Sequence, residues 1–179
     1  KTKVIIIQKS FSDYRKGIFS RLNDIYNLVV LHSNTDSGVK QVETNYSKKI
    51  KKIKYANKQT AIYLLCLKSI ISFKPEVIIH EFTPSILSIF PIILLKNFLG
   101  YKFILWGHGF NMSKTQNKNS IIYRVRKWLI NRADAVLFYG DKNKDYIQSV
   151  IPANKYFVAY NALDTDLFQS IKKELDDRG

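Results

Sequence analysis

The residues best suited to chemistry in this sequence follow the ends of short apolar runs. The clearest group is Gly107-His108-Gly109, which comes directly after the apolar residues 103–106. A histidine at such a point can contact a ligand, and the flanking glycines let the backbone turn sharply and let another molecule approach closely. The same triplet also fits a purely structural turn, so a ligand contact and a backbone turn are both open.

Three further candidates follow the first apolar run, residues 3–8, and one follows a later run, residues 76–80. Arg15 and Lys16, with Gly17 beside them, either supply positive charge to an anionic ligand or begin a solvated helix. Glu81 is the only carboxylate near the expected crevice in the middle of the chain. It either binds hydroxyl groups of a ligand, acts as a base, or has a plain surface role.

Several common chemistries are disfavoured by the motifs that the sequence lacks. The turn after residues 3–8 contains one glycine and no Gly-Lys-Ser/Thr, which disfavours NAD enzymes and P-loop nucleotidases. No Gly-x-Ser-x-Gly elbow occurs, which counts against an α/β-hydrolase. Asp164 and Asp166 are interpreted as a turn or helix cap, and Cys66 as a buried small hydrophobe, so no metal site is expected.

The chain alternates between β-branched apolar runs and stretches with helical spacing. Strands are expected at residues 3–8, 26–32, 76–80, 102–106, 135–139 and 156–160, and helices at residues 18–25, 58–73, 84–98, 121–131 and 142–150. Pro91 is expected to kink the third helix and Gly100 to end it, while residues 46–55 form either an edge strand or an exposed helical turn. The pattern predicts an α/β, Rossmann-like, three-layer domain with a mostly parallel sheet, whose strand ends gather the candidates at one edge.

Positive charge is concentrated in the middle of the chain. The net charge is +15, and residues 44–133 contain 16 Lys and Arg against only two acidic residues, Glu76 and Glu81. Such a field suits anionic lipid headgroups, a phosphate-bearing substrate or a nucleic acid, and a lysine-rich composition without a specific target also explains it. The longest uncharged stretch, residues 82–95, contains two prolines and is too short to span a bilayer.

The carboxyl-terminal part of the sequence resembles a known family. Residues 133–139, 142–151 and 155–168 resemble the end of the amino-terminal domain of group 1, or family-four, glycosyltransferases. That family reads Asn-Gly-x-Asp-Thr-x-x-Phe at the last of these segments, where this chain has Ala162 in place of glycine, and it often has Ser or Thr in place of Gly140. Residues 13–22 and 105–109 resemble the opening and the central strand end of the family.

The resemblance implies a GT-B fold, in which two Rossmann-like domains face each other across a cleft. Residues 1–168 match the first, acceptor-binding domain, and residues 169–179 are interpreted as a charged linker or the truncated start of the missing nucleotide-sugar domain. The implied full-length enzyme is a hexosyltransferase-type glycosyltransferase that moves a sugar from an NDP-sugar, with retention and without a metal or other cofactor. Its acceptor would be a glycan or a lipid-linked molecule in bacterial surface polysaccharide synthesis, and we expect the fragment alone to be inactive.

The same resemblance implies roles for individual residues. His108 matches the family's strand-end histidine that contacts the transferred sugar, and the glycines on either side belong to the same substrate-binding stretch. Gly17, with Arg15 and Lys16, matches the first-turn loop beside the donor phosphates. Asn161 lies at the crossing between the domains, where it is both a substrate-binding candidate and a turn former at the hinge.

The lysine-rich face beside the apolar residues 86–99 is expected to hold the enzyme on an anionic membrane surface, as a cytoplasmic protein peripheral to the inner face of the cell membrane. Two other classes of function stay open. One is a basic nucleic-acid-binding module, but the aromatic residues lie in apolar runs and no helix-turn-helix, RRM or KH signature is visible, so no nucleic acid partner is expected. The other is a stand-alone flavodoxin-like ligand-binding domain.

Overall fold

The computed structural model describes residues 1–33, 42–55, 60–63, 66–108, 120–140 and 151–160, together with residues 169, 173, 175 and 176. For residues 54, 55 and 60–63 it describes the backbone alone. The strands are β1 (Lys3–Gln8), β2 (Asn27–His32), β3 (Ser47–Lys49), β4 (Lys52–Tyr55), β5 (Thr60–Tyr63), β6 (Val77–Glu81), β7 (Lys102–Gly107), β8 (Ala135–Phe138) and β9 (Tyr156–Val158). The α-helices are α1 (Lys16–Ile25), α2 (Cys66–Phe73), α3 (Ile89–Leu99) and α4 (Ile121–Arg132), with short 3-10 helices η1 (Asp13–Arg15) and η2 (Ala153–Lys155).

Seven strands form one sheet in the order β3-β2-β1-β6-β7-β8-β9, and every neighbouring pair is parallel. Inside the sheet, between β2 and β6, lies β1, whose residues Ile5, Ile6 and Ile7 are fully buried, as a β-branched run covered on both faces requires. The strand order reverses between β1 and β6, so the crevice at the carboxyl ends opens beside these two strands. The expected α/β, mostly parallel, Rossmann-like fold is confirmed.

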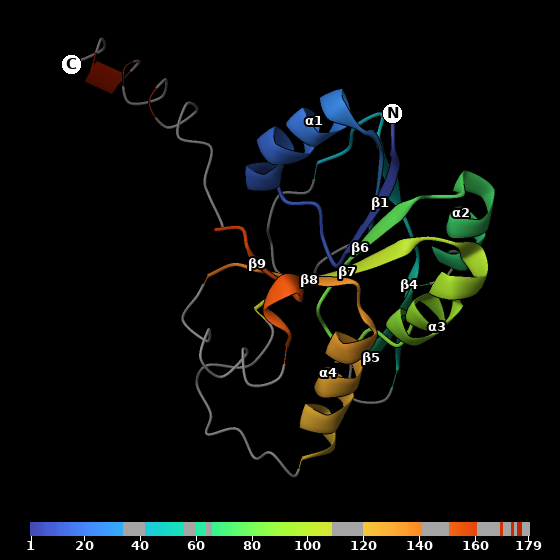
Figure 1. The fold of residues 1–179 in the computed structure, drawn as a ribbon. Helices are drawn as coiled ribbons and strands as arrows, with labels where there is room; N and C mark the ends of the chain where they lie inside the picture. The colour runs from blue at the N-terminus through green and yellow to red at the C-terminus, as the bar shows by residue number, and fades with distance from the viewer. Residues whose placement is uncertain are drawn as a thin grey trace.

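The described helices cover both faces of the sheet and make three layers (Figure 1). On one face Phe19 of α1 and Phe11 pack against the β1 and β2 side chains that point that way, such as Ile6 and Val30. On the other face α2, α3 and α4 pack against the remaining buried strand residues, such as Phe103. The two apolar clusters follow from the alternation of side chains along each strand.

Local sequence signals explain several element boundaries. Gly100 ends α3 in the left-handed conformation, with φ of 76°, which a residue without a Cβ adopts readily. The Ser120 side chain accepts a hydrogen bond from the Tyr123 N–H and so caps the start of α4. Cys66 at the start of α2 is buried, which raises the pKa of its thiol to about 12, and this matches the expected small core residue.

Asp134, the second residue of the segment 133–139, has a structural role. Its Oδ2 atom accepts hydrogen bonds from Lys96 Nζ at 2.9 Å and from the Phe103 N–H at 2.8 Å. Burial alone would raise the pKa of Asp134, but these two hydrogen bonds, with the charges of Lys96 and Lys102, hold it below its usual value. The carboxylate therefore joins the end of α3 to the start of β7.

Two of the expected helices are wrong in part. Residues 58–73 were expected to form one buried helix, but α2 begins only at Cys66, and β5 pairs with β4 as an antiparallel hairpin in a separate sheet. The backbone pairing of Ile53 with Ile62 shows that the lysine-rich and apolar stretches meet as strands. Of the two alternatives for residues 46–55, the strand is correct, since β3 lies at the sheet edge and β4 starts the hairpin.

The helix expected at residues 84–98 begins later, at Ile89. Pro84 lies instead in the turns that connect β6 to α3. Pro91 occupies the first turn of α3, where the missing N–H removes no intrahelical hydrogen bond, so the predicted kink has no cause there. The helix expected at residues 142–150 and the segment 161–168 lie outside the described residues.

Candidate functional site

A row of polar and aromatic side chains crosses the carboxyl edge of the sheet. The register pairs His32 with Gln8 and Glu81 with Trp106, and it places Gln8 beside Glu81 because Ile7 pairs with His80. These four side chains continue the two-residue alternation of the apolar cluster that α1 covers, so they share its face of the sheet. Four strands that are distant in the sequence thus contribute one surface.

Arg15 lies at the start of α1 and reaches over this edge. Its Nη2 group donates a hydrogen bond to the Tyr139 hydroxyl at 2.8 Å, and its Nε–H donates one to the Tyr14 hydroxyl at 3.1 Å. The guanidinium carbon also lies 5.1 Å from the Trp106 ring centroid and 5.6 Å from the Tyr139 centroid. We call Tyr14, Arg15, Trp106, His108 and Tyr139 the Arg15 cluster.

His108 belongs to this cluster through Tyr139. The centroids of the two rings are 4.7 Å apart, and the imidazole is exposed to solvent. Because Tyr139 also bonds Arg15, His108 and the start of α1, where Lys16 and Gly17 lie, occupy the same edge of the sheet. This is the juxtaposition that the sequence predicted for the strand-end histidine and the first turn.

Three members of the Arg15 cluster, Tyr14, Trp106 and Tyr139, were not identified as candidates from the sequence. Tyr139 follows β8 directly, and burial raises the pKa of its hydroxyl, although the charge and hydrogen bond of Arg15 act in the opposite direction. The Trp106 ring centroid lies 5.7 Å from that of Tyr139, with the rings tilted, and 6.0 Å from that of Phe19, in an edge-on contact. The sequence feature that could have identified Trp106 and Tyr139 is their position, since each lies at the end of an apolar run.

Gly107 has a packing role that the sequence does not reveal. A Cβ atom at this position would lie 3.2 Å from the Cβ of Phe82, closer than ordinary side-chain contacts. The β6 chain therefore approaches β7 at the point where His108 leaves the sheet, and only glycine fits without a shift. Gly109 and Asn161, the other two predicted substrate-binding residues, lie outside the described residues.

Glu81 is fixed by contacts within the chain. One carboxylate oxygen accepts a hydrogen bond from the Lys9 N–H at 2.8 Å, and the other accepts one from the Thr83 hydroxyl at 3.1 Å. The Lys9 ammonium lies 3.6 Å from the second oxygen. This arrangement holds the turn after β1 to the end of β6, so the geometry favours a positioning role for Glu81.

Next to Glu81, His80 is fully buried on the opposite face of the sheet. Burial lowers its pKa to about 4, and its Nδ1–H donates a hydrogen bond to the Glu81 carbonyl at 2.7 Å. The imidazole is therefore neutral and structural at neutral pH. Within the described parts of the chain, no group of three or more His, Cys, Asp or Glu residues is placed to hold a metal ion.

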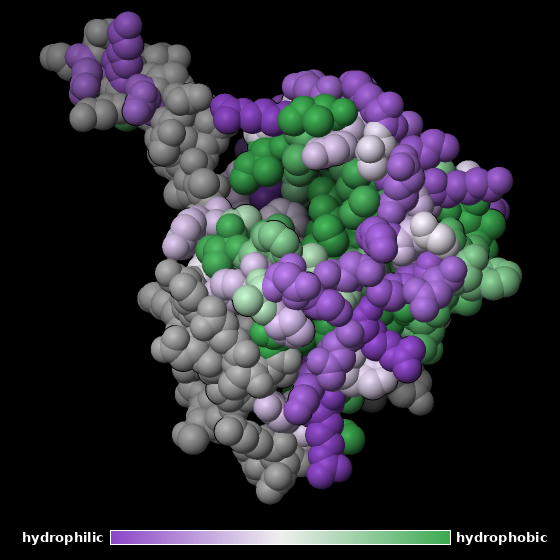
Figure 2. All heavy atoms as spheres, viewed as in Figure 1, coloured by the Kyte–Doolittle hydropathy of each residue, from purple (hydrophilic) through white to green (hydrophobic). Residues whose placement is uncertain are grey.

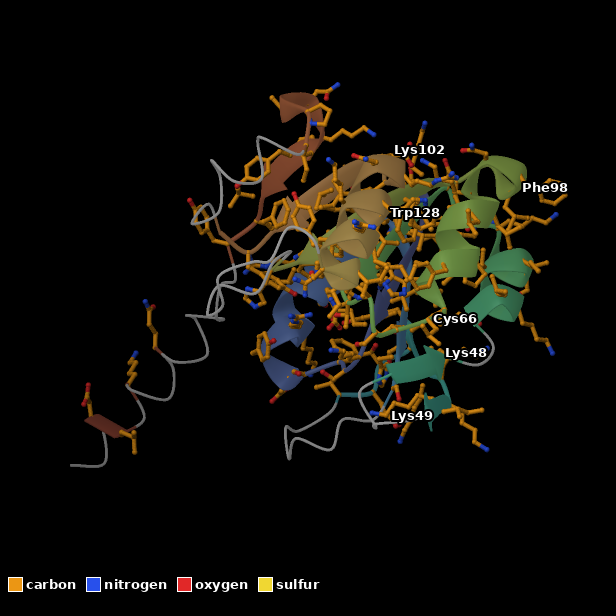
Figure 3. The ribbon with its side chains drawn as sticks, turned by 90° about the horizontal axis from the view of Figure 1, so that it is seen from below. Lys48, Lys49, Cys66, Phe98, Lys102 and Trp128 are labelled. Atoms are coloured by element: carbon orange, nitrogen blue, oxygen red, sulfur yellow. The ribbon has the colours of Figure 1, made fainter. Side chains whose placement is uncertain are left out.

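The helices α3 and α4 carry exposed apolar side chains as well as basic residues. Phe98 is 85% exposed at the end of α3, and Ile121 is 72% exposed at the start of α4. Between these helices, a pocket of about 310 Å³ is lined by Phe90, Arg124, Val125 and Trp128. Figure 3 shows Phe98 projecting from the edge of the molecule, away from Lys48 and Lys49. None of the helices in the described residues is long and apolar enough to cross a membrane.

Comparisons with known proteins support the fold and go no further. No family model and no curated protein sequence matches the chain. Among the solved structures that match, UDP-GlcNAc 2-epimerase from Methanocaldococcus jannaschii, a GT-B-like enzyme, has a TM-score of 0.54 and 14% sequence identity over 88% of this chain and 45% of that chain. The chain thus spans less than half the length of that enzyme. At this identity the likeness shows the fold alone, which is a Rossmann-like α/β domain.

Proposed function

We propose that this chain is the acceptor-binding domain of a retaining glycosyltransferase that transfers a sugar from an NDP-sugar to a glycan or lipid-linked acceptor in bacterial surface polysaccharide synthesis. The single observation that supports it best is the Arg15 cluster, which joins the start of α1 to His108 at one edge of the sheet. The fold is that of part of a GT-B-like enzyme, and the proposal adds a second, nucleotide-sugar-binding domain after residue 179.

Sugar transfer from an NDP-sugar requires positive charge near the diphosphate leaving group. The start of α1 presents the positive end of a helix dipole, and Lys16 and Arg15 add two formal charges. Arg15 uses two of its five N–H donors in the described contacts with Tyr14 and Tyr139, so the others are available to an oxyanion. Such preorganised charge stabilises the leaving group without a metal ion.

In the proposed reaction His108 contacts the transferred sugar, and the surrounding aromatic rings exclude water from it. Glu81 positions the turn after β1 and is not the base. Gly107 lets the histidine leave the sheet beside Phe82 without a clash. Gly109, Gly17 and Asn161 are proposed as backbone and side-chain contacts to the substrates.

The test uses the protein of the complete reading frame, assayed for transfer from labelled NDP-sugars to a membrane extract. Arg15→Ala and His108→Ala should each lower kcat/KM by about 100-fold or more, because each removes a group placed at the reacting centre. The matched control is Lys68→Ala, an exposed basic residue on α2, on the other face of the sheet. Unchanged transfer in both variants, or a sugar that is altered but not transferred, would contradict the proposal.

We also propose that the protein works on the inner face of the cell membrane as a peripheral protein. The exposed α3 residues Leu94 and Phe98, one helical turn apart, would enter the interface while Arg124 and Lys127 of α4 meet anionic headgroups. In vesicle sedimentation at low salt, binding should require anionic lipid, and Phe98→Ser should weaken it. Ile25→Ser on α1 removes a side chain that is 62% exposed on the other face and is the matched control. Equal binding to neutral and anionic vesicles would contradict this part.

A nucleic acid is not among the proposed partners. Fluorescence titration with single-stranded oligonucleotides tests this directly, since a basic protein of this charge binds non-specifically only weakly at physiological salt. Tight binding with a steep salt dependence would instead support the nucleic-acid-binding alternative.

A further inference from the structure

A lysine-lined pocket lies at the carboxyl edge of the sheet, at the end opposite the Arg15 cluster. It has a volume of about 460 Å³ and is lined by Ser33, Lys49, Ile50, Lys51 and Lys52. We call it the lysine pocket. Ser33 follows β2 and Lys49 ends β3, so both strands deliver their last residues to it. In Figure 3, Lys49 lies across the molecule from Lys102, which starts β7 at the other edge of the sheet.

The lysine pocket concentrates like charges around one space. Of the described residues that line it, Lys49, Lys51 and Lys52 are basic and none is acidic. Among the residues that the structure describes, neither Lys49 nor Lys51 forms an ion pair. Positive groups that share a pocket repel each other, and an anion bound between them removes that repulsion. The charge pattern therefore fits a ligand with a negative group.

Buried polar side chains lie on the strands next to the lysine pocket. His32 is 1% exposed and pairs in register with Lys49, while the Ile50 N–H donates to the His32 carbonyl at 2.7 Å. The side-chain amide of Gln8, the neighbour of His32 on β1, has no hydrogen-bond partner within the described chain. Both side chains are buried, so the groups that a ligand in the pocket can reach are the Ser33 hydroxyl and the lysine ammonium groups.

We propose that the lysine pocket binds a negatively charged group, a phosphate or a carboxylate, of the sugar acceptor. This deepens the proposed function and depends on it for the identity of the ligand. Lys49 and Lys51 supply the charge, and the Ser33 hydroxyl supplies a neutral hydrogen bond. Lys52 extends the positive field along the hairpin of β4 and β5.

The position of the pocket also predicts the size of the acceptor. From β3 to β7 the sheet has four interstrand spacings of about 4.8 Å, so the pocket lies about 19 Å from the end of β7 and His108. A single sugar is too short to reach both places. The acceptor is therefore an extended molecule that carries its charged group several bonds away from the hydroxyl that receives the new sugar.

The experiment measures binding to the 179-residue chain itself, without a donor sugar. Glucose 1-phosphate and glucuronate are titrated in separate arms, with neutral glucose as the blank, and backbone amide shifts are followed at Ser33, Ile50 and Lys51. We expect saturable shifts at these amides with at least one of the two anions. The double variant Lys49→Gln/Lys51→Gln should weaken binding by about tenfold or more, while Lys68→Gln/Lys74→Gln on and after α2 should leave it unchanged.

The possible outcomes distinguish a failure of the lysine-pocket proposal from a failure of the proposed function. Equal binding by the lysine-pocket variant and the wild type, or shifts that never saturate, would overturn the pocket even if the full-length enzyme transfers sugar. Saturable binding in a protein that transfers no sugar would preserve the pocket and overturn the proposed function. If phosphatidylglycerol vesicles, and neither soluble anion, compete for the same amides, the pocket binds lipid headgroups and the acceptor assignment is wrong.

Discussion

The two ends of the carboxyl edge differ in how their polar groups are satisfied. In the Arg15 cluster the cation lies against three aromatic rings and donates to two hydroxyl groups, so charge is held in place by the chain itself. In the lysine pocket, Lys49 and Lys51 line an open space and form no ion pair with a described residue. The Arg15 cluster is therefore preorganised, whereas the lysine pocket has positive charge that a bound anion would neutralise. The comparison shows that a charged residue stabilises the fold only where the chain supplies its partner.

The largest expected effect is a loss of stability at the Arg15 cluster. Trp106→Ala should lower the free energy of unfolding in urea by about 3 kcal/mol, because it removes a large ring that packs against Phe19 and Tyr139 and leaves a cavity. The comparison variant is Lys51→Gln in the lysine pocket. This substitution should change the free energy of unfolding by less than about 0.5 kcal/mol. Similar losses in the two variants would show that the two ends do not differ as described.

His80 lies between the Arg15 cluster and the lysine pocket, and its burial should make the stability of the fold depend on pH. Its pKa is about 4 in the folded chain against 6.5 when unfolded, so the unfolded state binds more protons between these values. Stability should therefore fall by about 2 kcal/mol as the pH is lowered from 7 to 5, and His80→Gln should remove that part of the slope. The measurement is urea unfolding at a series of pH values, and an unchanged slope in the variant would contradict it.

A smaller effect tests whether Arg15 and Tyr139 act as a unit. A double-mutant cycle with Arg15→Ala and Tyr139→Phe should give a coupling energy of about 1 kcal/mol, from one charged hydrogen bond and a cation–π contact. Arg15→Ala should also raise the pKa of Tyr139 further, because the guanidinium favours the phenolate. The control cycle replaces Tyr139→Phe by Tyr26→Phe, and equal coupling in both cycles would rule out a specific pair.

The smallest effect has the opposite sign and belongs to the lysine pocket. Lys49→Gln should raise the free energy of unfolding by a few tenths of a kcal/mol at low salt, because it relieves repulsion among the pocket lysines. Added salt screens that repulsion, so the gain should disappear in about 1 M NaCl. Lys68→Gln serves as the reference for an isolated exposed lysine, and a loss of stability in Lys49→Gln at both salt concentrations would contradict the charge argument.

The fold could be predicted from the sequence to the extent that single segments encode it. The β-branched run of β1, the glycine after α3 and the capping serine before α4 each favour one backbone conformation without help from the rest of the chain. The hairpin of β4 and β5 could not be predicted, because a lysine-rich stretch and an apolar stretch that pair as strands look like separate elements in the sequence. The late start of α3 was missed for a similar reason, since Pro84 suits a turn as well as a first helical turn.

The sequence indicated which polar residues follow strand ends and that they share one edge of the sheet, but not which side chains contact each other. His108, Arg15 and Glu81 could be singled out in this way, yet the sequence offered the same arguments for Glu81 as a base and as a structural residue. Its bonds to Lys9 and Thr83 favour the structural role. Trp106 and Tyr139 were passed over because aromatic residues at the end of apolar runs are normally core.

By itself the sequence determined the alternation of strands and helices, the parallel sheet that this alternation requires, and the excess of positive charge in the middle of the chain. Only the tertiary structure decided which strand ends are neighbours and which side chains share a face, since strand order and register depend on contacts between distant segments. For that reason it brought Arg15 against Trp106 and Tyr139, and it left Lys49 and Lys51 around a pocket with no described acidic partner.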